Sequence, residues 1–192
     1  MSDDLLCQAR VLIVDDEPSN VRLLERILEL NGKPAYRSTT DPRQTLPLLL
    51  EFEPDIILLD LHMPHLDGFG VLQMLRTAIP REAYIPVLVL TADITTETKK
   101  RAFVAGAQDF ITKPLDHSEV VLRMANLLEN RFLRLRLQEQ NAALEEQVRV
   151  RTGELEETLT QLRSTQGQVV KQERLHALEA QSAGPGSNGT PA

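Results

Sequence analysis

The sequence predicts an α/β fold, a (βα)5 doubly wound parallel sheet, with a long C-terminal α-helical coiled-coil extension. Three observations support this prediction. Short runs of Val, Ile and Leu alternate with segments of helical periodicity over the first 126 residues. The connections between these segments are short, which favours parallel strands with helices on both faces of one sheet. Beyond residue 126 the chain has one aromatic residue, Phe132, and no proline before Pro185, as expected for a long helix.

Continuous apolar runs identify the strands, because a strand inside a parallel sheet is buried on both faces. The strongest runs cover residues 11–14, 56–59 and 87–90. Weaker candidates cover residues 35–38 and 109–112.

Apolar residues spaced three or four apart predict the helices. Residues 18–30, 67–78 and 95–105 each place such a stripe on one face. A further helix begins at Asp41-Pro42, and Pro47 is expected to kink or shorten it.

The fifth helix is expected to continue beyond residue 116 without a helix breaker to about Leu178. A helix of this length must bury an apolar stripe to be stable. Its apolar positions follow alternating steps of three and four, with an interruption near Val148, which favours a dimeric coiled coil. The alternative is a single amphipathic helix folded back on the domain. The expected dimer seam comprises Leu137, Asn141, Leu144, Val148, Leu155, Leu159, Leu162 and Val169.

These patterns divide the chain into four parts. They are an N-terminal tail (1–8), a globular domain (9–126), a coiled-coil helix continuous with the fifth helix (127–179) and a disordered low-complexity tail (180–192).

Charge and composition exclude several classes of protein. With 21 basic and 28 acidic residues the net charge is −7, which argues against nucleic acid or an anionic membrane as the main partner. The longest strongly apolar run is far shorter than the ~20 residues of a spanning helix, and the acidic start is unlike a signal peptide. Cys7 is the only cysteine, so an intrachain disulfide is impossible. The expected location is the cytoplasm.

Three acidic residues stand at the ends of predicted strands. Asp15 and Asp16 follow the first strand and Asp60 ends the third. Ligands of open parallel sheets bind beyond the carboxyl ends of the strands, so these carboxylates are expected to converge. Clustered carboxylates raise one another's pKa unless a cation lies among them, and Mg²⁺ is the natural candidate. The alternative is a set of unconnected, solvated acids.

Two further residues stand at matching positions. Thr91 follows the fourth strand and Lys113 the fifth, so a hydroxyl and an ammonium are expected beside the acids. Alone, they would be an ordinary turn residue and a surface charge. Together with the acids they suit phosphoryl transfer to a carboxylate, which requires positioning and neutralisation of charge.

Four motifs resemble those of a known family, the CheY-like receiver domain of bacterial two-component response regulators. They are Val-Asp-Asp-Glu (14–17), Leu-Asp-Leu-His-Met-Pro with Asp-Gly (59–64 and 67–68), Leu-Thr-Ala (90–92) and Phe-Ile-Thr-Lys-Pro (110–114). The resemblance covers about residues 9–126 and implies a flavodoxin-like strand order, 2-1-3-4-5.

The resemblance implies that Asp60 accepts a phosphoryl group from a partner sensor histidine kinase. It assigns Mg²⁺ to the side chains of Asp16 and Asp60 and the backbone carbonyl of His62, with Asp15 acting mainly through a metal-bound water. Such a domain is not a conventional enzyme, since it catalyses only its own phosphorylation and dephosphorylation.

The same resemblance assigns Thr91 and Lys113 to the phosphoryl oxygens. Phe110 is expected to be the aromatic residue that turns inward when Thr91 moves, and the Lys113–Pro114 peptide is expected to be cis.

Residues 149–157 resemble linker helices that precede sensor-kinase or cyclic-dinucleotide domains. The expected output is therefore a signal passed through a parallel homodimer. Alternatives are a receiver-headed scaffold, or a piece of a hybrid kinase or cyclic-dinucleotide enzyme. A remote alternative is a haloacid-dehalogenase-like phosphatase, but that family has an acid where this chain has His62.

Overall fold

A computed structural model describes residues 6–80, 83–93 and 95–182 of the chain. It confirms the predicted fold, a five-stranded, all-parallel sheet with the order β2-β1-β3-β4-β5. The strands are β1 (Arg10–Val14), β2 (Ala35–Thr39), β3 (Ile56–Asp60), β4 (Val87–Thr91) and β5 (Asp109–Thr112).

The register of the sheet aligns the ends of the strands. Val14 is opposite Leu59, so Asp15 and Asp60 follow paired residues of β1 and β3. Thr91 is opposite Thr112, so Thr91 and Lys113 lie at the same edge. The predicted site residues therefore lie at one end of the sheet because the strands end together.

Helices alternate with the strands. They are α2 (Pro18–Leu30), a 3-10 turn η1 (Pro42–Gln44), α3 (Thr45–Phe52), α4 (Gly68–Ala78), α5 (Thr96–Ala105) and α6 (His117–Ser182). Local side chains cap several of them: Asp67 accepts from Gly70 N at the start of α4, and Thr95 from Thr98 N at the start of α5. Pro47 lies in the first turn of α3, where it interrupts little, and α3 is short at eight residues.

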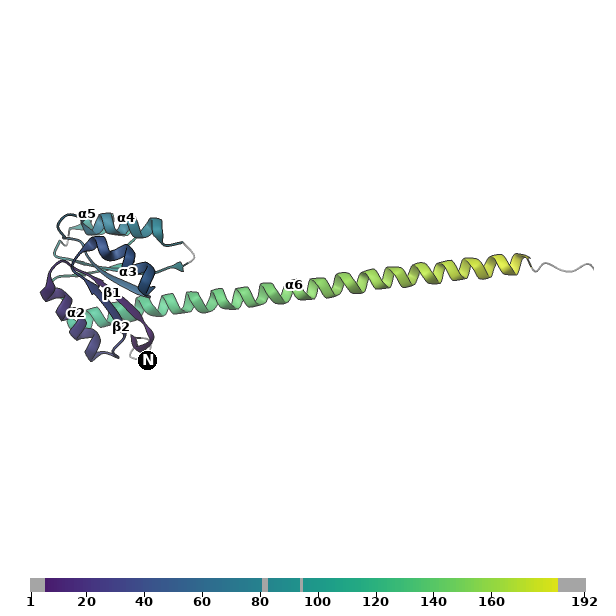
Figure 1. The fold of residues 1–192 in the computed structure, drawn as a ribbon, viewed down its shortest axis with the longest axis horizontal. Coiled ribbons are helices and arrows are strands. Elements are labelled where there is room, and N and C mark those ends of the chain that lie inside the picture. Colours follow the sequence, from purple (N-terminus) through teal and green to yellow (C-terminus); the bar gives the residue numbers. More distant parts are fainter. Residues whose placement is uncertain (1–5, 81–82, 94, 183–192) are drawn as a thin grey trace, which may run out of the picture. The chain divides into compact units, whose positions relative to one another are not determined.

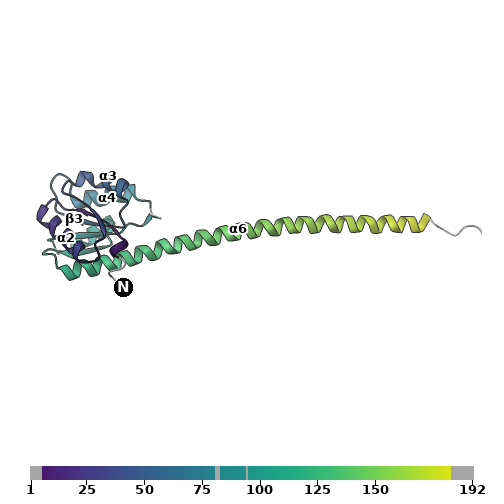
Figure 2. The same ribbon diagram turned by 60° about the horizontal axis from the view of Figure 1, so that its bottom comes forward.

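The sheet separates two apolar layers (Figures 1 and 2). α3, α4 and α5 cover one face, and α2 with the first turns of α6 covers the other. Because successive side chains point to opposite faces, Leu12 and Val14 pack in one layer while Val11 and Ile13 pack in the other.

Packing against the sheet continues beyond residue 126, where the globular domain was expected to end. Leu127 and Leu128 are buried, and Phe132 packs against the same layer. Leu6 is also buried in this layer, so the expected N-terminal tail contributes to the core; residues 1–5 lie outside the described residues. In both places apolar side chains join the layer that α2 and the first turns of α6 form on the sheet.

The chain divides into two units, residues 1–137 and 138–192, which are described separately. In the second unit α6 continues to Ser182, three residues past the predicted end of the coiled coil, and the remainder of the predicted tail lies outside the described residues. Every residue of the expected seam is exposed on this chain, from 48% at Val169 to 64% at Leu155 among the apolar ones. Across the part of the chain that the structure describes, none of the helices is both long and apolar enough to cross a membrane.

Candidate functional site

The candidate site lies at the carboxyl edge of the sheet. Asp15 follows β1, Asp60 and Thr91 are the last residues of β3 and β4, and Lys113 follows β5. Asp15, Asp60 and Thr91 are buried, at 0%, 3% and 1% exposure, although all three are polar. Buried carboxylates require partners, because burial without one is costly.

Lys113 is that partner for two of the acids. Its Nζ lies 2.9 Å from Asp15 Oδ2 and 3.0 Å from Asp60 Oδ1. Burial alone would lower the pKa of Lys113, but the hydrogen bond to Asp15 and the negative charges of Asp60 and Asp15 outweigh it and raise the pKa above the usual 10.5. Lys113 is therefore a fixed positive charge at neutral pH.

Asp15 is also held by Asn20, a residue that the sequence analysis did not identify. Asn20 Nδ2 donates to both carboxylate oxygens, at 3.0 and 3.1 Å, and Glu17 N donates to Oδ1 at 2.9 Å. Asn20 lies in the first turn of α2, five residues after Asp15. These donors leave Asp15 well satisfied, which supports a role as a fixed charge.

Asp60 is less well satisfied. Its Oδ1 is buried and, among the described residues, accepts no hydrogen bond of good geometry, although Lys113 forms an ion pair with it. One oxygen from each of Asp15, Asp16 and Asp60 lies within 4.8 Å of the other two. Such a group of hard oxygen ligands with an unsatisfied atom fits a divalent cation such as Mg²⁺.

The pKa of Asp16 is also affected by the neighbouring carboxylates. Burial, followed by repulsion from Asp60 and Asp15, raises the pKa of the Asp16 carboxyl above 3.8. The cluster has three carboxylates and one ammonium, so it carries excess negative charge that a cation would relieve.

Thr91 is tied to the start of α5. Its Oγ1 accepts a hydrogen bond from Asp93 N at 3.0 Å and donates to Asp93 O at 3.4 Å. The Asp93 carboxylate in turn accepts from Thr95 N at 2.8 Å and from Thr98 Oγ1 at 2.6 Å. Any movement of the Thr91 hydroxyl therefore breaks contacts with the turn that begins α5.

Phe110 lies on β5 beside α5. Its ring meets Phe103 edge to face, with centroids 5.8 Å apart, and Lys99 Nζ lies 4.3 Å from its centroid. The ring is partly buried against the layer that contains α4 and α5. The Lys113–Pro114 peptide at the end of the same strand is cis.

The loop after β3 completes the site. His62 is exposed two residues after Asp60, while Gly68 folds back onto the end of the strand. A Cβ at Gly68 would lie 2.3 Å from the carbonyl oxygen of Asp60 and 2.7 Å from Cα of Leu61. Gly68 therefore allows α4 to approach the backbone that carries Asp60.

Comparison with known proteins matches this site to a family. Residues 11–125 match the response regulator receiver domain. The chain is 40% identical over 119 residues to the DNA-binding dual master transcriptional regulator RpaA of Synechocystis sp., covering 62% of this chain and 48% of that protein. It is 31% identical over 156 residues to a probable cyclic di-GMP phosphodiesterase of Vibrio cholerae, covering 81% of this chain and 35% of that protein.

A solved structure gives the same result. The receiver domain of the Francisella response regulator 1452 is 29% identical, with a TM-score of 0.59, and the match covers 64% of this chain and 98% of that domain. The chain spans about half of the length of the RpaA relative and about a third of the phosphodiesterase relative.

Proposed function

Because the chain belongs to the response regulator receiver domain family, we propose that Asp60 accepts a phosphoryl group from the phosphohistidine of a sensor histidine kinase. The observation that carries this proposal is the Lys113 ammonium held 2.9 Å from Asp15 and 3.0 Å from Asp60. It provides a nucleophilic carboxylate beside a fixed positive charge at the end of a parallel sheet.

In the proposed transfer an Asp60 carboxylate oxygen attacks the phosphorus atom of the donor. A P–O bond forms, the P–N bond of the phosphohistidine breaks, and the released imidazole takes its proton from solvent. Lys113 offsets negative charge on the phosphoryl oxygens, which is the main requirement of such a transfer. Asp15 holds the Lys113 ammonium in position, and Asn20 in turn holds the Asp15 carboxylate.

Asp16 and Asp60 would hold Mg²⁺ through their side chains and His62 through its carbonyl, with Asp15 nearby. The cation would add positive charge beside the phosphoryl oxygens. The unsatisfied Asp60 Oδ1 and the raised pKa of Asp16 support this assignment.

Phosphorylation would then change the hydrogen bonds of Thr91. A phosphoryl group on Asp60 offers new acceptor oxygens, and the Thr91 hydroxyl would exchange its contacts with Asp93 for one of them. Phe110 would follow by turning inward, which changes the surface around α5 and β5. Phe110 lacks the hydroxyl of a tyrosine, so its outward rotamer has no hydrogen bond to lose.

Incubation with acetyl phosphate and Mg²⁺ tests the assignment. Peptide mapping by mass spectrometry should place one phosphoryl group on Asp60. Asp60→Asn should abolish labelling, whereas Asp67→Asn, which keeps a helix-capping side chain, should retain it. Labelling of another residue in the Asp60 variant, at the wild-type rate, would reject the proposal.

The part of α6 from Leu137 to Ser182, here called the arm, is proposed to carry the output by forming a parallel homodimer, with the receiver domain followed by a coiled coil. The exposed seam residues support this role, since large apolar side chains repeat along one helix and remain exposed among the described residues.

A second candidate output is cyclic di-GMP turnover. The match to the Vibrio cholerae protein covers 156 residues, more than the 137 residues of the first unit, and so includes part of the arm. The coding sequence after the Ala192 codon tests this candidate. An in-frame phosphodiesterase domain would support it; a stop codon, with no phosphodiesterase among co-purified proteins, would reject it.

A further inference from the structure

A groove lies between α4 and α5, and none of the residues of the acidic cluster lines it. It has a volume of about 470 Å³. Phe69 and Arg76 line it from α4, and Lys100, Arg101, Val104 and Ala105 line it from α5. No role in the proposed transfer uses this groove.

The lining of the groove includes accessible apolar side chains, which form its apolar floor. Phe69 is partly buried, whereas Val104 is 70% exposed. Exposed apolar side chains of this size inside a concave surface are typical of places where another molecule binds.

Two arginines connect the helices on either side of the groove. The Arg101 guanidinium lies 4.3 Å from the centroid of the Phe69 ring, so α5 reaches over α4. In the opposite direction, Arg76 Nη1 donates to the carbonyl of Val104 at 3.5 Å. Both guanidinium groups remain on the exposed surface, with donors available to a ligand.

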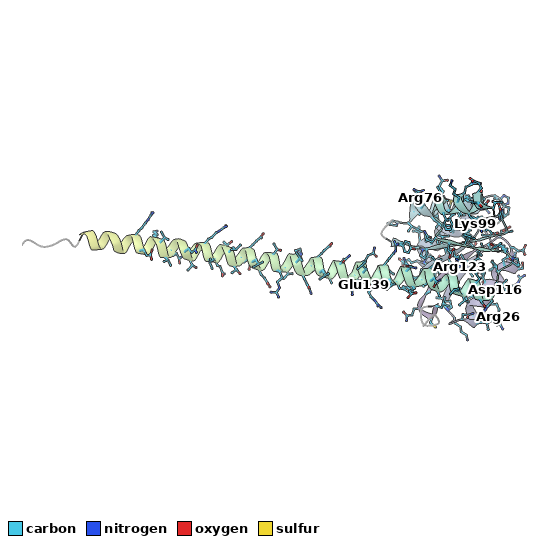
Figure 3. All side chains as sticks on the ribbon, turned by 180° about the vertical axis from the view of Figure 1, so that it is seen from behind. Arg26, Arg76, Lys99, Asp116, Arg123 and Glu139 are labelled. Atoms are coloured by element: carbon cyan, nitrogen blue, oxygen red, sulfur yellow. The ribbon has the colours of Figure 1, made fainter. Side chains whose placement is uncertain are left out.

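The groove is basic on an acidic chain. The lining of the groove contains three basic residues, Arg76, Lys100 and Arg101, and one acidic residue, Glu97. The net charge of the lining is therefore 3 − 1 = +2, against −7 for the whole chain. Figure 3 labels Arg76 on this part of the surface, and Lys99 on the neighbouring part of α5.

These cations contact the molecule through Arg101 on the Phe69 ring and Arg76 on the Val104 carbonyl, but neither contact neutralises their charge. None of the ion pairs formed by the described residues involves Arg76, Lys100 or Arg101. Lys99 is different, because it lies over Phe110 on the β5 side of α5. The three remaining cations therefore line the groove and stay exposed, with Arg101 over the Phe69 ring.

We propose that this groove binds an acidic amphipathic segment of a partner protein. Apolar side chains of the segment enter between Phe69 and Val104, and its carboxylates pair with Lys100 and Arg101. An apolar floor with a basic rim matches a helix that has one apolar and one acidic face. A nucleic acid would use the basic rim but leave the apolar floor without a partner.

A synthetic amphipathic helix, with leucine on one face and glutamate on the other, tests this proposal on the full-length protein. Amide chemical shifts should change at Phe69, Arg76 and Val104 and remain unchanged at the acidic cluster. The double variant Lys100→Glu, Arg101→Glu should weaken binding about tenfold or more, corresponding to ~1.4 kcal/mol. The control Arg22→Glu, Arg163→Glu changes the net charge equally at exposed positions elsewhere and should bind as wild type.

If the double variant fails to fold, Lys100→Glu alone provides the comparison, because this exposed side chain makes no ion pair within the described chain. A helix with lysine in place of glutamate should not bind. The proposal is overturned if the lysine helix binds equally well, if the shifts map elsewhere, or if the charge reversals have no effect. Tighter binding of duplex DNA or of phosphatidylglycerol vesicles at the same residues would also overturn it.

Discussion

Lys113 lies between two buried carboxylates, and this placement controls how the site responds to charge. Its ammonium is 2.9 Å from Asp15 and 3.0 Å from Asp60, so one cation serves two anions. Asp16 adds a third carboxylate to the same cluster. The folded protein therefore holds these acids closer together than the unfolded chain does, and its stability should depend on whether they are ionised and on divalent cations.

Replacement of Asp16 by Asn should stabilise the metal-free protein at neutral pH. Burial and repulsion raise the pKa of Asp16 in the folded state above 3.8. A raised carboxyl pKa means that the neutral form favours folding; this contribution is present below pH 3.8 and is lost as the pH rises through the folded pKa. Thermal unfolding with a chelator should show a higher Tm for the variant at pH 7 and a shrinking difference toward pH 3.8.

Mg²⁺ provides the internal control for this prediction. It should raise the Tm of the wild type more than that of Asp16→Asn, because the variant has lost a ligand and a charge. Equal stabilisation of the two proteins by Mg²⁺ would contradict the assignment of Asp16 as a ligand.

Gly68→Ala should disturb the backbone beneath the acceptor. Its Cβ would lie 2.3 Å from the carbonyl oxygen of Asp60, so the strand end or α4 must move. The expected cost is about 1–3 kcal/mol in urea unfolding, as for other overpacked sites, with slower labelling by acetyl phosphate.

Gly70→Ala is the matched control in the same helix. There the new Cβ meets Cδ1 of Leu66 at 2.6 Å, the end of a flexible side chain that can rotate away. This variant should unfold close to wild type. If both variants lost equal stability, the loss would reflect helix α4 and not the approach to Asp60.

The site could be predicted in part from single residues. The three acids, Thr91 and Lys113 were placed correctly at strand ends, because parallel strands that end together bring those positions to one edge. Asn20 could not be identified, since its contact with Asp15 depends on how α2 leaves the sheet. Gly68 was noted as part of a motif, but its close approach to Asp60 follows only from the folded backbone.

At the scale of elements, α6 belongs partly to the globular unit. Val120, Met124 and Leu128 repeat at steps of four and are buried against the sheet. The composition of the chain changes near residue 126, but the buried stripe continues past that point. Composition alone could not distinguish the apolar stripe that packs on the sheet from the exposed apolar stripe that begins at Leu137.

A single arginine fixes this part of α6 to the start of the strands. Arg131 Nε lies 2.9 Å from Asp55 Oδ1, and its Nη1 donates to the carbonyls of Ala83 and Tyr84. The side chains of Arg131 and Asp55 are only 11% and 14% exposed. Arg10 N donates to the other Asp55 oxygen at 3.0 Å, which joins β1 to the same contact.

Arg131→Met should therefore lower the stability of the globular unit by about 3 kcal/mol, because it leaves a nearly buried carboxylate without its cation. Arg134→Met is the matched control. The Arg134 guanidinium lies 3.8 Å from the centroid of the Tyr84 ring, a contact that contributes about 0.5–1 kcal/mol at exposed sites. Because the chain has no tryptophan, urea unfolding is followed by circular dichroism, which should show a larger loss of stability for Arg131→Met than for Arg134→Met. Equal losses of stability would reject a special role for Arg131.

In the second unit, large apolar side chains of α6 stay exposed among the residues that the structure describes. Leu144, Leu155 and Leu162 are 58%, 64% and 55% exposed. They recur along a helix whose neighbouring positions are polar, so burial between two copies would remove a continuous apolar stripe from water. Asn141 in this stripe favours two strands in one register.

Leu155→Lys with Leu162→Lys would place like charges opposite each other in a parallel pair and should convert the protein to a monomer. Thr160→Lys with Gln161→Lys adds the same charge on the outer face of the same helix and should leave the dimer intact. Truncation after Leu137, which keeps Leu127, Leu128 and Arg131, should give a folded monomer. Sedimentation equilibrium of these four proteins decides the matter, since a monomeric wild type at tens of micromolar, or a truncated chain that still forms a tight dimer, would exclude the arm as the dimerising element.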